Sequence, residues 1–344
     1  MNRRPATGVT GSAEGRRRRA SGLATGSRAE ALFRAAQTAL TACMGIGRNE
    51  RLLVVCDPPC ADVGEAFLRA GMQLARETVM VQITPRRLDG EEPPEPVGAW
   101  FAQFDAAVMP TSMSLTHTKA RRDACAAGTR VATLPGITAE IFVRTMRTDW
   151  RALAERTRAF AARLNAAATV RVTTAAGTDL TFQTGGRKAK SDDGDYRQRG
   201  VFGNLPAGEA YLAPLEGTAQ GRLVADGSFP LAGLLKTPLV VEVRDGLATS
   251  VSGHPCSREW KGILDRIGPD ARNVAEFGVG TLDTARVAGN VLEDEKVLGT
   301  IHIAFGNNAS MGGAVTAPVH LDAVVRKPSV WLDGALWMRN GVVG

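Results

Sequence analysis

Short apolar runs alternate with helical segments through the first half of the chain, and this rhythm restricts the fold more than any other feature of the sequence. Residues 27–46 and 61–76 show helical periodicity on either side of the first run. Strand–helix alternation is typical of a parallel sheet with helices on both faces, so an α/β N-terminal domain with a Rossmann-like rhythm is predicted. The predicted strands of this sheet span residues 51–56, 79–83, 105–109 and 130–134.

The sequence changes character after a long predicted helix at residues 149–168. Short β-like segments separated by glycine-containing turns follow, beginning with a hairpin around Ala176 and Gly177. A second, β-rich domain of the α+β class is therefore expected in the C-terminal half. The expected division is a tail at residues 1–27, an α/β domain at 28–160 and a β-rich domain at 161–344.

The positive charge of the chain is concentrated at its N-terminus. The formal net charge is +7, and residues 1–28 hold seven arginines against one acid, Glu14. The remainder is nearly neutral, which argues against nucleic-acid binding by the folded part, because such binding needs a concentrated basic surface. The tail has the composition of a disordered segment and lacks the apolar stretch of a secretory signal, so weak nucleic-acid binding is left open for the tail alone.

Several functions are excluded by what the sequence lacks. No run of about 18 apolar residues is present, so no membrane-spanning helix is predicted. No Gly-x-Gly-x-x-Gly motif follows the first strand and no Gly-x-Ser-x-Gly motif occurs, which argues against a dinucleotide site and a serine nucleophile. Five scattered cysteines without metal-ligand spacing are typical of reduced thiols, and a cytoplasmic protein is expected.

Two of the four histidines lie in well-defined contexts. His302 is inside the apolar run 299–306, which has the pattern of a strand, and His320 stands two residues before Asp322. Strand alternation places His320 and Asp322 on the same side, from which both reach one metal ion. A single strand histidine is more often a hydrogen-bonded core residue, so neither context alone establishes a metal site.

Two glutamates extend this set. Glu276 lies in an apolar, glycine-flanked run, and Glu209 follows a glycine in a similar setting. A charged side chain in such surroundings costs free energy unless it is paired or bound to metal. Three carboxylates and two imidazoles suit two divalent ions that share a water or a carboxylate, although separate surface or capping roles are the alternative. The candidate ligands are Glu209, Glu276, His302, His320 and Asp322.

Other polar segments have a structural interpretation. The charged run at residues 293–296 is expected to be a solvated loop. The polar segment 112–117 follows the third predicted strand, where open α/β sheets bind ligands, although capping the next helix is the commoner role. Arg187 lies in a predicted turn and is a weaker candidate for contact with a substrate carboxylate.

Five motifs occur in an order that resembles a known family, the thermophilic-type metallo-aminopeptidases, also called the aminopeptidase T family and similar to leucyl aminopeptidases. The similarity covers roughly residues 200–344 and extends weakly to residues 114–118 and 134–138. Five ordered motifs are more specific than any one of them. The motifs span residues 203–209, 275–281, 292–296, 299–306 and 320–322.

This resemblance implies a metal-binding catalytic C-terminal domain with two zinc, cobalt or manganese ions at the five candidate ligands. It also implies a homodimer, and a hydrolase that removes N-terminal residues from short peptides or related small amides. Two ions would lower the pKa of a bridging water and polarise the scissile carbonyl. Glu209 or Glu276 would take the proton as the catalytic carboxylate. The main expectation is therefore a cytoplasmic metallo-aminopeptidase.

The same sequence pattern also resembles that of a second enzyme class. The dihydroxypyridine ring-cleaving dioxygenases use one Fe(II), held by two histidines and an aspartate. They keep the pair at His320 and Asp322, have a histidine at the position of Glu276 and lack a counterpart of His302, so the ligand set favours the hydrolase. The tyrosine that follows the first histidine of the peptidases is absent here. A third alternative is a specialised biosynthetic enzyme or a non-catalytic binding protein on this scaffold.

Overall fold

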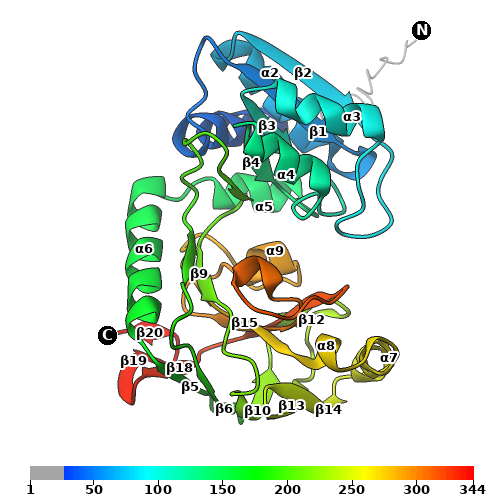
Figure 1. Ribbon diagram of the computed structural model, residues 1–344. Helices are drawn as coiled ribbons and strands as arrows, with labels where there is room; N and C mark the ends of the chain where they lie inside the picture. Colours follow the sequence, from blue (N-terminus) through cyan, green and yellow to red (C-terminus); the bar gives the residue numbers. More distant parts are fainter. Residues whose placement is uncertain (1–26) are drawn as a thin grey trace, which may run out of the picture.

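A five-stranded parallel sheet forms the centre of the N-terminal region in the computed structural model, which describes residues 27–344 (Figure 1). Its strand order is β2-β1-β3-β4-β8, and all neighbouring strands are parallel. Its strands are β1 (Arg51–Cys56), β2 (Glu77–Gln82), β3 (Ala106–Met109), β4 (Arg130–Thr133) and β8 (Phe202–Asn204).

Alternate residues of this sheet enter two separate apolar clusters, one on each face. Leu52 and Val54 of β1 lie in one cluster, whereas Leu53 and Val55 lie in the other. Helices therefore cover both faces, as the apolar character of the strands predicts. A helix over residues 27–38 continues as a π-helical turn at Ala39–Cys43. The other helices here are α2 (Ala61–Leu74), α3 (Glu95–Trp100), α4 (Lys119–Ala126) and α5 (Ala139–Thr145).

The C-terminal region is built from two antiparallel sheets that enclose a second core. One has the order β14-β13-β10-β6-β5-β18-β19-β20, and the other has the order β17-β16-β15-β9-β7. Their facing sides meet in a shared apolar cluster, in which the rings of Phe182 and Phe277 lie 5.3 Å apart. Strands of the larger sheet are β5 (Thr169–Thr173), β6 (Asp179–Gln183), β10 (Gln220–Ala225), β13 (Leu239–Arg244), β14 (Leu247–Gly253), β18 (Ser329–Leu332), β19 (Ala335–Arg339) and β20 (Val342–Val343).

The smaller sheet carries all five candidate ligands. Its strands are β7 (Lys190–Asp192), β9 (Glu209–Leu212), β15 (Val274–Gly280), β16 (Ile301–Gly306) and β17 (His320–Val325). A two-stranded ribbon and three helices complete the region. They are β11 (Ser228–Phe229), β12 (Gly233–Leu234), α7 (Ser257–Ile267), α8 (Pro269–Arg272) and α9 (Val291–Asp294).

Helix α6 (Trp150–Ala166) connects the two regions (Figure 1). Asp149 caps its first turn by accepting hydrogen bonds from the backbone N–H groups of Arg151 and Ala152, which satisfies donors that would otherwise be unpaired. Phe160 and Leu164 on this helix pack into the C-terminal core. The helix therefore packs on the sheets of the C-terminal region, and its first turn lies next to the N-terminal region.

The predicted fold class is confirmed, because a parallel-sheet α/β region precedes a β-rich one. The boundary at residues 160 and 161 stays a prediction, and β8 crosses it by pairing with β4 of the first sheet. The expectations for the arginine-rich tail concern residues 1–26, which lie outside the described part of the chain. Within residues 27–344, no helix combines the length and the apolar character needed to cross a membrane.

Candidate metal centre

Four neighbouring strands of the smaller sheet bring the five candidate ligands to one face. In the register, Ala304 of β16 stands opposite both Glu276 of β15 and Asp322 of β17, so the two carboxylates lie in one row. Phe277 points into the core, and strand alternation therefore turns Glu276 to the opposite face, toward the N-terminal region. Glu209 enters the same face from β9, opposite Gly280.

Glycines opposite the ligands leave the space that their side chains occupy. Gly278 pairs with His302, and a Cβ atom at Gly278 would lie 1.9 Å from Nε2 of His302. Only a residue without a side chain allows the imidazole to lie over the strand at this point. Gly278 of the 275–281 motif thus leaves the space that the imidazole of His302 occupies.

Glu276 lies between the two histidines and directs one oxygen toward each. Its Oε1 is 3.3 Å from Nε2 of His302, and its Oε2 is 3.1 Å from Nε2 of His320. The outer histidine, His320, is also 3.5 Å from Oδ1 of Asp322, and the inner one, His302, is 3.4 Å from Oε2 of Glu209.

These contacts define two overlapping groups of possible metal ligands. The outer group contains Glu276, His320 and Asp322, and the inner group contains Glu209, Glu276 and His302. In each group the donor atoms lie within 4.8 Å of one another. The structure therefore brings all five predicted residues together, and Glu276 belongs to both groups. Their assignment as ligands stays a prediction.

Burial and mutual contact shift the pKa values of these groups strongly. Burial alone would raise the pKa of Glu276, but hydrogen bonds with His302 and His320 hold it well below its usual range. Burial alone would lower the pKa of His302, but Glu276 and Glu209 raise it to about 9. The pKa of His320 is likewise raised well above its ordinary value, with Asp322 as the largest opposing cause. The centre is thus an array of carboxylates that favours positive charge.

A backbone contact orients the outer histidine. Nδ1 of His320 lies 2.8 Å from the carbonyl oxygen of Asn307, an arrangement that requires a proton on Nδ1. Nε2 is then the free donor atom and points at the carboxylates, as in many metal sites. Nδ1 of His302, by contrast, has no hydrogen-bond partner among the described residues.

The loop that precedes His320 is held by Glu216, a residue that sequence reasoning did not single out. Its Oε1 accepts hydrogen bonds from Nδ2 of Asn308 at 2.9 Å and from the backbone N–H of Ala314 at 2.8 Å. Arg187 forms an ion pair with its other oxygen. This arginine, predicted as a weak candidate for substrate contact, thus has an internal partner. Glu216 stands in a loop sequence without any distinctive pattern, so no sequence signal marked it.

The prediction that residues 293–296 form a solvated loop is wrong. Helix α9 and the turn after it are buried, and Glu293, Asp294 and Lys296 are each 0% exposed. These charges have partners that a sequence pattern does not reveal. Glu293 pairs with Arg144, which is far away in the sequence, and Asp294 accepts hydrogen bonds from backbone N–H groups of the preceding loop. The place of this run among the five ordered motifs was the signal that it is not an ordinary surface loop.

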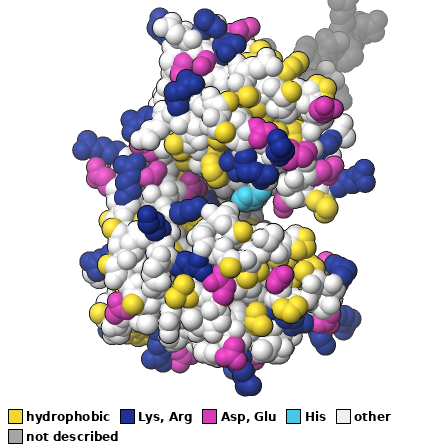
Figure 2. All heavy atoms as spheres, in the orientation of Figure 1, with side chains coloured by type: hydrophobic (Ala, Val, Ile, Leu, Met, Phe, Trp, Pro, Cys, Tyr) yellow, Lys and Arg dark blue, Asp and Glu magenta, His cyan; other side chains and the backbone are white. Residues whose placement is uncertain are grey.

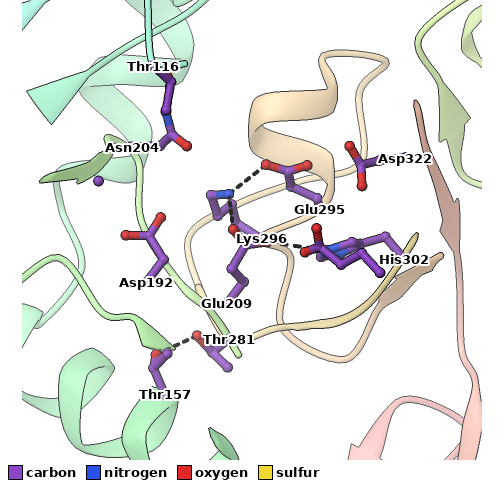
Figure 3. Close-up of polar contacts among 12 residues, drawn as sticks. Thr116, Thr157, Asp192, Asn204, Glu209, Thr281, Glu295, Lys296, His302 and Asp322 are labelled. Atoms are coloured by element: carbon purple, nitrogen blue, oxygen red, sulfur yellow. Dashed lines mark hydrogen bonds and ion pairs between the residues drawn. The ribbon is translucent and has the colours of Figure 1, made fainter. Parts of the chain in front are cut away.

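Lys296 reaches the metal centre from the side opposite the outer group. Figure 3 shows its ammonium between Glu209 and Glu295, with Nζ 2.8 Å from Oε1 of Glu209 and 2.6 Å from Oε1 of Glu295. Burial raises the pKa of Glu295 to about 8 and that of nearby Asp192 to about 7. Burial alone would lower the pKa of Lys296, but Glu209 and Glu295 raise it well above its ordinary value.

The polar segment 112–117 lies at the boundary between the two regions. The hydroxyl groups of Thr116 and Thr133 are hydrogen-bonded at 2.7 Å, and Asn204 donates to Thr133 at 2.8 Å. Figure 3 shows Thr116 and Asn204 beside each other. The expected helix cap is supplied instead by Thr118, whose hydroxyl accepts from the backbone N–H of Arg121. Figure 2 shows an exposed histidine in the hollow between the two halves of the molecule, flanked by basic side chains.

His117 ends this segment and is electrostatically linked to the metal centre. Burial lowers its pKa, and the positive charges of His320 and Arg121 lower it further, while Glu276 partly opposes them. A neutral imidazole at neutral pH is the consequence.

A family profile decides between the enzyme classes. The profile of the NicX family, 2,5-dihydroxypyridine 5,6-dioxygenase, matches residues 94–344, which include the whole candidate centre. The chain belongs to this family. A 2,5-dihydroxypyridine 5,6-dioxygenase of Pseudomonas putida is 23% identical over 237 residues, which is 64% of this chain and 66% of that protein. The match thus spans slightly less than two thirds of the relative's length.

Solved structures show the same fold. The 2,5-dihydroxypyridine dioxygenase of Pseudomonas putida has a TM-score of 0.78 at 19% identity, covering 91% of this chain and 96% of that one. AmpT of Thermus thermophilus has a TM-score of 0.70 at 17% identity, covering 91% and 99%. At these identities the likeness establishes the fold and leaves the reaction to other evidence.

The expectation of a metallo-aminopeptidase is wrong, because the family match identifies dioxygenase relatives in place of a hydrolase or protease. The reason is that the five ordered motifs belong to a scaffold that AmpT shares, so they report the fold and not the reaction. The proton-acceptor role predicted for Glu209 or Glu276 belongs to that hydrolase mechanism. A candidate metal-binding site among the described residues is present.

Proposed function

We propose that this protein is an Fe(II)-dependent dioxygenase that opens the ring of a hydroxylated pyridine or a closely related aromatic heterocycle. The observation that carries the proposal is the family match over residues 94–344, within which Glu276, His320 and Asp322 converge. The name of the curated relative supplies the first substrate to try, 2,5-dihydroxypyridine. In that reaction the bond between C5 and C6 breaks, and both atoms of O2 enter the product.

The donor set fits a divalent iron ion. Imidazole and carboxylate donors suit Fe(II), and a facial set of three leaves positions open for other ligands. The outer group supplies one imidazole and two carboxylates, so Glu276 stands in place of the second histidine of the two-histidine, one-carboxylate iron triad, and the two negative charges match the charge of the ion. When bound, Fe(II) would supply the redox chemistry that reaction with O2 requires. Nδ1 of His302 forms no hydrogen bond within the described residues, and it belongs to the inner group and not to the three proposed iron ligands.

Residues of this chain would hold and orient the substrate. His117, in the segment that borders the centre, is neutral at neutral pH because of its lowered pKa and is suited to accept a proton from a ring hydroxyl. The amide nitrogen of Asn204 donates to the hydroxyl of Thr116 and to that of Thr133, so these side chains would shape the wall of the substrate space (Figure 3). A homodimer, which the sequence resemblance implied, stays a prediction.

The experiment is oxygen uptake by protein loaded with Fe(II) under anaerobic conditions and then mixed with oxygenated 2,5-dihydroxypyridine. We expect uptake of one O2 for each substrate consumed, and loss of uptake in H320A and D322A. The matched control is H254A, because His254 lies outside the centre and its side chain accepts a hydrogen bond from the backbone N–H of Cys256. Folded, iron-loaded protein that consumed no oxygen with any hydroxylated pyridine would refute the proposal.

A further inference from the structure

The inner group of possible ligands has the composition of a second metal site. Glu209, Glu276 and His302 are all buried, and each offers a donor atom to a common space. Nothing in the identities of these three residues prevents a second divalent ion from binding there. Any restriction on binding of a second ion must therefore come from the residues around these three.

A fixed positive charge already occupies those surroundings. Lys296 is 0% exposed, and its Nζ donates to Oε1 of Glu209 at 2.8 Å and to Oε1 of Glu295 at 2.6 Å (Figure 3). Donation to two carboxylates is the pattern of a protonated ammonium. The side chain is held by the turn after α9, where the backbone of Lys296 donates to Glu293 and accepts from Leu282. The charge is therefore placed by the fold and cannot move away as a free ion would.

We propose that Lys296 acts as a built-in cation that satisfies Glu209 and Glu295 and so restricts the centre to a single divalent ion, held by Glu276, His320 and Asp322. This inference deepens the proposed function and rests on it for the identity of the resident metal. The lysine is a specificity-determining residue, because it sets how many ions bind and does not contact the substrate.

The geometry explains the restriction. One oxygen of Glu209 is taken by the ammonium, and its other oxygen faces Nε2 of His302 at 3.4 Å. An ion in the inner group would have to share this carboxylate with the ammonium, and two like charges on one carboxylate repel each other strongly in a buried setting. Within the described residues, the carboxylates of Glu276 and Asp322 pair with histidines and with no lysine or arginine, so an ion in the outer group shares its carboxylates with no fixed ammonium.

The test measures bound metal and not activity. Metal-free wild type, K296M and K296R are dialysed against Zn2+, a redox-inert probe, and the metal per chain is determined by elemental analysis. Methionine keeps the length of the side chain without its charge, and arginine keeps the charge. We expect about one ion per chain in the wild type and in K296R, and a doubling to about two in K296M. Two ions in the wild type, or one in K296M, would overturn the proposal.

A second pair of variants keeps the inference testable if K296M does not fold. H302A removes a ligand of the inner group only, and H320A removes a ligand of the outer group only. We expect H302A to retain its ion and H320A to lose it, whereas loss of the ion from H302A would contradict the assignment. Neither result depends on ring cleavage: one ion without oxygen uptake would refute the function alone, and two ions with oxygen uptake would refute the role of Lys296 alone.

Discussion

Replacing Glu293 by glutamine is expected to destabilise the protein severely, although the residue lies in a run that has the composition of a surface loop. Its carboxylate is 0% exposed and accepts from Nε of Arg144 at 3.1 Å and from Nη2 at 2.7 Å. The backbone N–H of Arg286 donates to the same carboxylate at 3.0 Å. This pair joins α5 of the N-terminal region to α9, which positions Glu295 and Lys296.

The magnitude follows from the burial of the two partners. Removing one member of a buried, hydrogen-bonded ion pair costs about 3–5 kcal/mol, because the remaining charge loses its compensation. Arg144 is 16% exposed and keeps an ion pair with Glu140 at 2.8 Å, so part of its charge stays compensated. The lower end of the range, about 3 kcal/mol, is therefore expected for E293Q.

A matched control exists on the same arginine. Glu140 is 85% exposed and pairs with Arg144 along one helix, so E140Q should change the free energy of unfolding by about 0.5 kcal/mol or less. Urea denaturation followed by circular dichroism gives both values under identical conditions. Equal effects of E293Q and E140Q would refute the reasoning, because burial would then not decide the strength of the pair.

Three further predictions concern the metal centre. G278A should destabilise the protein by about 1–3 kcal/mol in denaturant titrations, because the added Cβ would lie 1.9 Å from Nε2 of His302. G262A serves as the control, because a Cβ at Gly262 has nothing within 4 Å. Equal changes in the free energy of unfolding of the two variants would contradict the packing argument. Burial alone lowers the pKa of His320, but neighbouring carboxylates raise it well above its ordinary value, so metal binding must displace a proton. The affinity should therefore fall about tenfold per unit once the pH is below that raised pKa. A pH-independent affinity in competition titrations would count against ligation by His320. E216A should weaken metal binding about tenfold by releasing the loop before His320, and an unchanged affinity would show that this loop is held by other contacts.

The elements of the fold were predictable wherever a local pattern exists. The run 51–56 coincides with β1, because an uninterrupted apolar stretch has few alternatives to a buried strand. β8 was not predictable, since its three residues, Phe202–Asn204, acquire their structure only by pairing with β4, a strand far away in the sequence.

The candidate centre was predictable in its members and not in its surroundings. His320 and Asp322 share a face by strand periodicity, and the structure confirms that they lie side by side. The burial of Glu293 and Lys296 depends on partners 149 and 87 residues away, which no local pattern reveals. The reaction was predicted wrongly, because the ordered motifs describe a scaffold that serves more than one chemistry.

The origin of the oxygen atoms in the product distinguishes a dioxygenase from a hydrolase directly. Iron-loaded protein and 2,5-dihydroxypyridine are incubated under 18O2, and the ring-opened product is examined by mass spectrometry. A dioxygenase predicts incorporation of both labelled atoms into a single product molecule. An unlabelled ring-opened product, formed under 18O2 without consumption of O2, would contradict the proposed reaction.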